Sequence, residues 1–268
     1  YDLYNRGEIG DSEYNFSSLF SLEFDDEELG SYFINWHYHE SEWEAANDFL
    51  GKNDYQQAIN LFKTYIAYES DDSKKIDALK KIAESYEELE DYRNALDYYD
   101  RLILLEPLND YHLGHKAYAL YKLNEFELSE EFYKDAIDIN PSNIWAYSGY
   151  GDCLREQEKF DEAIEVFNQG IERNPEQPPK TTSLFWLHQV KAHSYYQLEN
   201  MALAAESYEG AIDVAINQKL NKSVYALSYR RAAQAYYSLD KYELAIDYYL
   251  NSQEGDDDFK DTYTYYYL

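Results

Sequence analysis

The sequence predicts an all-α protein built from about six antiparallel helix pairs, and two observations support this prediction. Three of the five prolines, Pro107, Pro141 and Pro175, are spaced 34 residues apart, and a fixed period of this length is typical of helix-pair repeats. Small and aromatic residues also recur at the same positions of each period. Because proline lacks an amide hydrogen and clashes with the preceding turn, we expect each of these prolines to close a repeat.

Each repeat opens with a small residue, and a second small residue follows it twelve positions later. An aromatic residue comes four positions after the second small one. The first small residues are Ala46, Ala83, Ala117, Gly151, Ala192 and Ala233, the second are Ala58, Ala95, Ser129, Ala163, Ala204 and Ala245, and the aromatic residues are Phe62, Tyr99, Tyr133, Phe167, Tyr208 and Tyr249. Small residues let two antiparallel helices approach closely, and aromatic side chains fill the space around them. The pattern predicts six hairpins from about Ser41 to about Asn251, with short polar turns such as 52–54 and 89–91.

On these residues the chain resembles the tetratricopeptide repeat family. The resemblance implies a right-handed superhelical solenoid in which the first helix of each pair lines a concave groove. The array, residues 31–251, departs from a regular period, because successive second small residues are 37, 34, 34, 41 and 41 positions apart. Extra residues therefore lie near 70–73, 176–182 and 217–223, where either the helices extend or loops project.

The two ends of the chain differ from the array. Residues 1–30 form an acidic N-terminal segment with nine acidic residues and one basic residue. Residues 31–43 are aromatic, and we expect them to begin a leading helix. In the C-terminal part, residues 252–268, an acidic break at 254–258 precedes residues 259–268, which we expect to form a capping helix or a truncated seventh repeat.

Charge and composition exclude several classes of protein. The formal net charge is -30, so nucleic acid and anionic membranes are not expected partners, because both bind through basic residues. The chain is 18% aromatic and 45% hydrophobic, which disordered acidic chains are not. No apolar run is long enough to span a membrane. The single cysteine, Cys153, excludes an intrachain disulfide and fits a reducing compartment, so we expect a cytoplasmic protein.

The sequence contains no constellation typical of an enzyme. His112 and His115 are three residues apart, which would bring both near one metal ion on a helix, but no further cysteine or histidine is spaced to complete a zinc site. We expect them to be surface or groove histidines. A glycine-rich phosphate loop and a nucleophile elbow are both absent, and Cys153 is interpreted as a packed small residue. We therefore expect neither catalysis nor a cofactor or metal.

The resemblance places a stripe of each first helix in the groove, and in repeats three to six this stripe has an unusual composition. Its twenty-four positions hold four basic and two acidic residues, together with two tryptophans and five tyrosines. Aromatic residues and arginine are enriched where proteins bind one another. The residues expected to bind a partner are Tyr111, His115, Tyr118, Tyr121, Lys122, Trp145, Arg155, Trp186, His193, Tyr196, Arg230, Arg231 and Tyr237. The alternative is that the aromatic residues pack helix against helix.

The stripe predicts a scaffold that binds a protein or peptide of aromatic or acidic character. Two alternatives are a self-assembling structural protein and a regulatory domain of a larger protein or enzyme. Family members that grip the C-terminal peptides of chaperones use lysine, asparagine and arginine at positions that here are Trp43, Asn47, Lys81, Tyr111 and His115. Only Asn47 fits, so this particular function is not expected.

Overall fold

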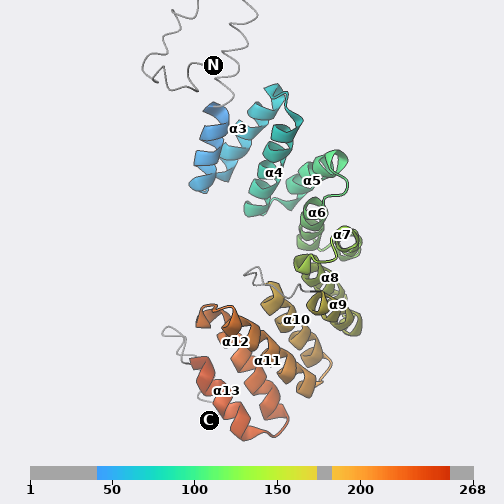
Figure 1. Cartoon of the computed structure of the whole chain (residues 1–268), viewed down its shortest axis with the longest axis vertical. Helices are drawn as coiled ribbons and strands as arrows, with labels where there is room; N and C mark the ends of the chain where they lie inside the picture. The colour runs from blue at the N-terminus through green and yellow to red at the C-terminus, as the bar shows by residue number, and fades with distance from the viewer. Residues whose placement is uncertain (1–40, 174–182, 254–268) are drawn as a thin grey trace, which may run out of the picture. The chain divides into compact units, whose positions relative to one another are not determined.

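The computed structural model describes residues 41–173 and 183–253. Every regular element within these two ranges is an α-helix (Figure 1). Residues 41–51 are helical, and the complete helices are α3 (Tyr55–Tyr68), α4 (Asp72–Glu88), α5 (Tyr92–Leu105), α6 (Asp110–Lys122), α7 (Phe126–Ile139), α8 (Ile144–Glu156), α9 (Phe160–Glu172), α10 (Ser183–Gln197), α11 (Met201–Asn217), α12 (Lys222–Ser238) and α13 (Tyr242–Gln253). The prediction of six helix pairs is confirmed, from residues 41–51 with α3 to α12 with α13.

The chain divides into two compact units, residues 1–89 and residues 90–268. In unit 1, α3 packs on α4. The ring of Trp43 contacts those of Phe62 and Tyr65, with ring centroids 5.3 Å and 5.1 Å away. Lys81 lies above the same tryptophan, 5.8 Å from its centroid. These contacts give unit 1 an aromatic core of its own.

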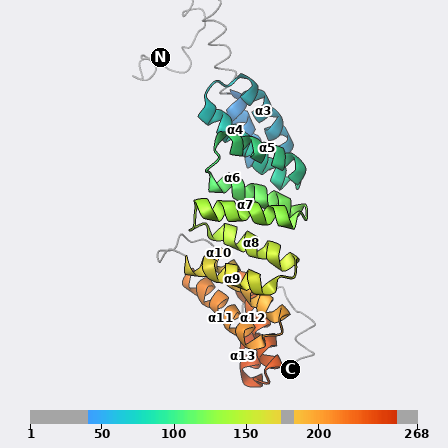
Figure 2. The same cartoon turned by 90° about the vertical axis from the view of Figure 1, so that its right-hand side faces the viewer.

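In unit 2, each helix from α5 to α13 packs on the next one along the chain. Figure 2 shows α6, α7, α8 and α9 lying side by side in this order. The helix α8 also contacts α6 and α10 directly. We refer to α6, α8, α10 and α12 as the first helices and to α7, α9, α11 and α13 as the second helices. The first helices α6, α8 and α10 are thus neighbours of one another, which is what a shared binding face requires.

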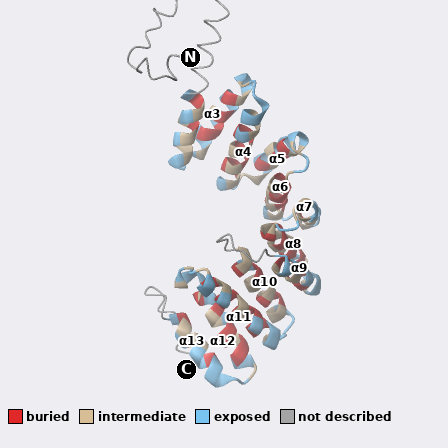
Figure 3. Ribbon diagram, in the orientation of Figure 1, coloured by how far each residue is buried: buried red, intermediate tan, exposed pale blue. Residues whose placement is uncertain are grey.

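The small residues lie where the helices of a pair approach most closely. All six first and all six second small residues are buried (Figure 3). The contact is direct in the pair α6–α7, where the Ser129 hydroxyl donates to the Ala117 carbonyl oxygen at 2.7 Å. Because a larger side chain at either position would push the two backbones apart, these residues set the spacing of the pair.

The aromatic residue that follows the second small residue fills the core of its repeat. Five of the six are buried, and only Tyr249 in the last helix is half-buried. Close approach depends on glycine in two cases. A Cβ added to Gly151 would come within 2.1 Å of the Phe167 ring, and one added to Gly149 within 2.2 Å of the Tyr133 ring.

The expected polar turns connect the helices of each pair. Asn53 and Glu90 have positive φ angles of 58° and 56°, a conformation that ends a helix but costs a residue with a Cβ about 1 kcal/mol. The next residues, Asp54 and Asp91, accept hydrogen bonds from backbone amides of the following helix. The turn therefore closes one helix and caps the next within three residues.

The prolines mark the ends of repeats, whereas the extra residues lengthen helices. Pro107 and Pro141 lie two residues after the last residues of α5 and α7, next to the C-caps Glu106 and Asn140, so each proline closes its repeat as predicted. The extra residues near 70–73 and 217–223 are absorbed by longer helices, because α4, α11 and α12 have 17 residues whereas α6 and α8 have 13. Of the two alternatives, helix extension is correct at these places.

Several predictions lie outside the described residues: those on the acidic segment 1–30, on Pro175 with residues 176–182, and on residues 254–268. Of the leading segment 31–43, only 41–43 are described, and they are helical. No helix in the described ranges combines the length and the apolar character needed to cross a membrane.

Candidate partner-binding surface

The thirteen residues predicted to bind a partner all lie on the first helices of unit 2. None of them is buried; each is half-buried or exposed. Trp186 and Tyr237 are 46% and 45% exposed, which is high for large aromatic side chains. We call these thirteen residues the first-helix face. Its aromatic side chains are open to contact, whereas the repeat aromatics of α7, α9 and α11 are not.

An aromatic cluster joins α5, α6 and α8. The ring of His115 lies at the centre, with the Tyr111 and Trp145 rings at 4.1 Å and 4.9 Å between centroids. Tyr99 stacks on the same imidazole at 5.7 Å, and Tyr118 lies 6.2 Å from Trp145. We call these five residues the aromatic cluster. The alternative that such residues pack helix against helix is therefore correct here, although all members but Tyr99 remain half-buried.

Two neighbours shape this cluster. A Cβ added to Gly114 would come within 2.7 Å of the Trp145 ring, so only glycine lets the indole lie against α6 as it does. The Lys122 ammonium is 5.5 Å from the centroid of the Tyr118 ring, at the range of a cation–π contact. The cluster thus offers a preformed aromatic platform with a cation at one end.

The two histidines of α6 have different surroundings. His112 is only 2% exposed, and its Nε2 is 2.8 Å from a carboxylate oxygen of Glu106. The prediction of a surface or groove position is wrong for His112, because Glu106 compensates the burial of its ring. His115 belongs to the aromatic cluster instead. Among the described residues, no group of three or more metal-ligating side chains is present.

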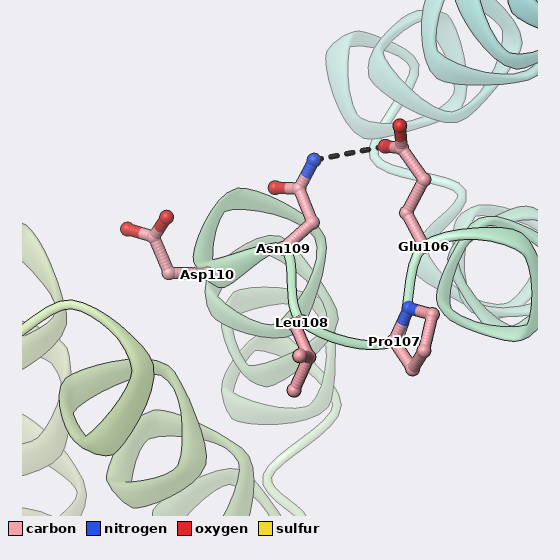
Figure 4. Close-up of a pocket in the computed structure, with 5 residues that line it drawn as sticks. All are labelled: Glu106, Pro107, Leu108, Asn109 and Asp110. Carbon is pink, nitrogen blue, oxygen red and sulfur yellow. Dashed lines mark hydrogen bonds between the residues drawn. The ribbon is translucent and has the colours of Figure 1, made fainter.

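A surface hollow of about 520 Å³ lies at the turn between α5 and α6, lined by residues 106–110 (Figure 4). Its polar groups are engaged by the protein. The Asn109 amide donates to Glu106 at 2.9 Å, and Asp110 accepts a hydrogen bond from the Asn140 amide at 2.9 Å. The first bond lies within the turn and the second joins it to the turn after α7, so we interpret the hollow as a feature of the turn and not as a ligand site.

A basic cluster joins three first helices: Arg155 of α8, His193 of α10 and Arg231 of α12. Burial is the main cause that lowers the pKa of His193 to about 4, and the positive charges of Arg155 and Arg231 contribute to the same shift. Tyr208 of α11 experiences the same two charges, although burial outweighs them and raises its pKa to about 12. We call Arg155, His193 and Arg231 the basic cluster.

Carboxylates accompany Arg155 on its own helix. Arg155 Nη1 donates to Asp152 Oδ1 at 2.5 Å, and burial raises the pKa of Asp152. Tyr121 of α6 lies near the same group. Burial, followed by the charges of Asp152 and Glu156, raises the pKa of Tyr121 to about 12. The sequence pattern predicts both Tyr121 and Arg155 on one face, and the structure brings them together.

Cys153 has the role expected of it. The side chain is fully buried, and its Sγ donates to the Ser129 hydroxyl at 3.1 Å. Burial raises the pKa of the thiol to about 12. A thiol with this pKa forms almost no thiolate at neutral pH and is a poor nucleophile, so the interpretation as a packed small residue is confirmed.

Other predicted residues have contacts of their own. The Trp186 ring contacts Phe185 at 5.0 Å, and Tyr237 contacts Tyr242 at 5.5 Å across the α12–α13 turn. Sequence reasoning missed Tyr99 and Tyr208, which it assigned only to packing. No signal in the sequence singles them out, because this repeat position holds tyrosine in four of the six repeats and phenylalanine only in the other two.

Comparison with known proteins agrees with the geometry. Two family models, both described as tetratricopeptide repeat, match the chain. One matches residues 120–180. The other matches residues 80–144 and 190–258, which together make half of the chain.

Individual relatives are more distant. Protein STIP1 homolog of Dictyostelium discoideum is 30% identical over 142 residues, covering 48% of this chain and 23% of the relative. The Hsp70-Hsp90 organising protein of Plasmodium falciparum is 31% identical over 102 residues, covering 38% and 17%. The chain thus spans less than a quarter of either relative. The solved C-terminal part of a repeat-containing protein from Cytophaga hutchinsonii has a TM-score of 0.61 at 18% identity, covering 80% of this chain and 79% of that one, which supports the fold alone.

Proposed function

Because the chain belongs to the tetratricopeptide repeat family, we propose that it is a protein–protein interaction scaffold and not an enzyme. Its binding site is the first-helix face of unit 2, and its ligand is an extended segment or helix of a partner with aromatic or acidic character. The lone, unreactive Cys153 supports a reducing, cytoplasmic setting.

The distribution of charge is the observation that carries this proposal. The four first helices of unit 2 contain seven basic and three acidic residues, whereas the four second helices contain one basic and fourteen acidic residues. A chain with a net charge of -30 thus keeps one layer of helices close to neutral or positive. Such a layer attracts an acidic segment that the rest of the molecule would repel.

One relative is named as an Hsp70-Hsp90 organising protein, but we do not propose this role for the present chain. Of the positions used to grip chaperone peptides, only Asn47 has the expected residue, and its amide donates to the Trp43 carbonyl oxygen at 2.7 Å. In the same unit Lys81 lies over the Trp43 ring. These side chains serve the packing of unit 1, so we propose a ligand other than a chaperone tail.

A displayed library of random twelve-residue peptides tests the proposal. Peptides selected on the full chain should lose about 5- to 100-fold in affinity with Trp186→Ala, because an exposed aromatic anchor is worth about 1–3 kcal/mol. The matched control is Leu128→Ala on α7, which is 47% exposed but lies on a second helix. Equal losses in both variants, or none in either, would contradict the assignment of the face.

The preference for acidic ligands has a separate test. Arg230→Glu combined with Arg231→Glu should weaken the selected peptides, and unchanged affinity at low and moderate salt would contradict the preference. If residues 1–30 fill the face in the free protein, their removal should strengthen binding, since a competing acidic segment is lost. Unchanged affinity after removal would exclude such self-masking.

Self-assembly is the second candidate function, and α13, the last helix of the described residues, favours it. On α13, Ile246 and Leu250 are 44% and 51% exposed, and a second copy of the chain would cover them. Sedimentation of the pure protein at two concentrations tests this candidate. A sedimentation coefficient that rises with concentration supports self-assembly, and a constant monomeric value excludes it over that range. A role as the regulatory domain of a larger protein also fits the short share of each relative that the chain spans.

A further inference from the structure

The basic cluster lies where three neighbouring repeats meet. Arg155, His193 and Arg231 come from the first helices of three successive pairs, and both guanidinium charges act on the imidazole of His193. The hydroxyl of Tyr208, which comes from α11, experiences the same two charges. Four side chains from four helices are therefore within electrostatic range of one another.

The environment of His193 contains hydrogen-bond donors and positive charge. Its Nε2 is 2.9 Å from the Gln197 amide nitrogen, which assigns Nε2 as the acceptor and leaves the proton on Nδ1. With its lowered pKa, the ring is neutral at pH 7. Burial and the two arginines account for the lowered pKa, and among the described residues no carboxylate is a cause of it. This is unusual in a chain with 53 acidic residues.

The arginines are incompletely compensated. Arg155 pairs with Asp152, but the Nε of Arg155 is buried without a hydrogen-bond partner. Glu156 is the other acidic residue of α8 and is exposed to solvent. Arg231 Nη1 donates to the neutral Gln234 at 3.1 Å. A buried donor without an acceptor costs about 1–3 kcal/mol, so an acceptor that enters here recovers favourable free energy.

We propose that Arg155, His193 and Arg231 form a subsite for one oxyanion of the bound segment, a carboxylate or a phosphate group. The subsite rests on the proposed function and makes it specific. Guanidinium groups bind both kinds of oxyanion through paired N–H donors, and the Nδ1–H of His193 adds a third. The oxyanion accepts from the Arg155 Nε that the pair with Asp152 leaves unsatisfied, and it gives Arg231 a negatively charged acceptor beside the neutral Gln234. The aromatic cluster on α6 and α8 then contacts neighbouring apolar residues of the same segment.

The subsite differs from the chaperone-peptide positions of the family. The equivalent positions in repeats four to six are Ser148, Asp152, Val190, Leu227 and Arg231. Only Arg231 is shared between that set and the basic cluster. The proposal therefore follows from where this chain places its own arginines.

Small anions test the subsite without a known partner. The full chain is titrated at constant ionic strength with N-acetylglutamate amide, N-acetylphosphoserine amide or, as a neutral control, N-acetylglutamine amide, while the His193 ring resonances are followed by NMR. We expect either anion to shift these resonances and to raise the pKa of His193 by about one unit, because it neutralises the adjacent guanidinium charges. The neutral amide should do neither. The stronger of the two anions identifies the kind of oxyanion that the subsite prefers.

Matched variants separate the subsite from general charge attraction. Arg231→Gln should raise the dissociation constant of the bound anion about fivefold or more. Arg93→Gln makes the same substitution at an exposed arginine of α5, outside the first-helix face, and it should change the constant less than about twofold. Equal effects of both variants, no effect of Arg231→Gln, or equal shifts with the neutral amide would each overturn the proposal. If selected peptides still depend on Trp186 in any of these cases, the scaffold function stands and only the subsite fails.

Discussion

In unit 2 the second helices α7, α9 and α11 bury their repeat aromatics and carry many acidic residues, whereas the first helices show large aromatic side chains at the surface and carry few acidic residues. Phe167 on α9 is fully buried, while Trp186 on α10 is 46% exposed. Glu165 on α9 is exposed, as is most of its helix's charge. Both kinds of helix contribute to the core, since Tyr147 on α8 and Phe185 on α10 are also buried. On our proposal the second helices supply the acidic surface, and the first helices supply the contacts to a partner.

The largest expected effect tests the difference between first and second helices through the stability of the protein. Phe167→Ala should lower the free energy of unfolding by about 3–5 kcal/mol, because it opens a cavity at a fully packed site. Trp186→Ala should cost less than about 1 kcal/mol, since that ring is half in solvent. Guanidinium unfolding followed by circular dichroism measures both. Similar losses would show that the first helices are as much a part of the core as the second ones.

A second effect is the pH dependence of the free energy of unfolding, which arises from two histidines on the first helix α10. Burial lowers the pKa values of His188 and His193, both on α10, to about 4. Their ordinary value is about 6.5, so the unfolded chain binds more protons between these limits, and the stability they contribute is complete above pH 6.5 and lost as the pH falls toward 4. Burial raises the pKa of Asp152, which opposes this loss.

The partial exposure of the two histidines and the opposing effect of Asp152 both reduce the expected change in stability. We therefore expect the free energy of unfolding to fall by about 2–4 kcal/mol from pH 7 to pH 4.5. Urea unfolding at four or five pH values measures the slope. The double variant His188→Gln with His193→Gln should lose most of this decrease in stability over the same range. If the variant keeps the slope of the original protein, other groups are responsible for it.

The third effect concerns α13, where the pattern of buried repeat aromatics ends. Tyr249 on α13 is the only one of the six repeat aromatics that is not buried. In a repeat array the last helix exposes the face that a following helix would cover. We expect residues 259–268 to provide this cover, and their deletion should cost about 1–3 kcal/mol or cause aggregation. Thermal unfolding and light scattering measure the outcome. An unchanged melting temperature would show that this segment does not cover α13.

Much of the fold could be predicted because repetition makes weak signals additive. Ala117 or Ser129 alone says little, but six equivalent small residues at one spacing require close helix pairs. The extra residues near 217–223 could not be assigned to helix or loop, because both choices satisfy the same spacing. Helix extension prevails there, and Lys219 turns the chain with a positive φ of 56° between two long helices.

Much less of the site could be predicted. Periodicity placed His115 and Trp145 on one face, but it could not show that their rings pack against each other. His112 was expected at the surface, and its burial depends on Glu106, six residues earlier, which no helical period relates to it. Tyr208, on a second helix, experiences the charges of two arginines on first helices, and such proximity depends on the three-dimensional packing of repeats.

The smallest effect concerns the turn that separates the two kinds of helix. Glu158 lies between α8 and α9 with a positive φ of 60°, where any residue with a Cβ is strained and glycine is not. Relief of about 1–2 kcal/mol of strain exceeds the backbone entropy that glycine costs, so Glu158→Gly should stabilise unit 2 by about 0.5–1 kcal/mol. The matched control is Glu162→Gly, four residues later and exposed within α9, which should destabilise unit 2 by about 1 kcal/mol.

If Glu158→Gly stabilises the protein and Glu162→Gly destabilises it, the backbone conformation of each residue, and not the lost carboxylate, decides the result. If both variants are stabilised equally, relief of charge repulsion on the acidic second helices is the main cause instead, and raising the salt concentration should then remove the gain.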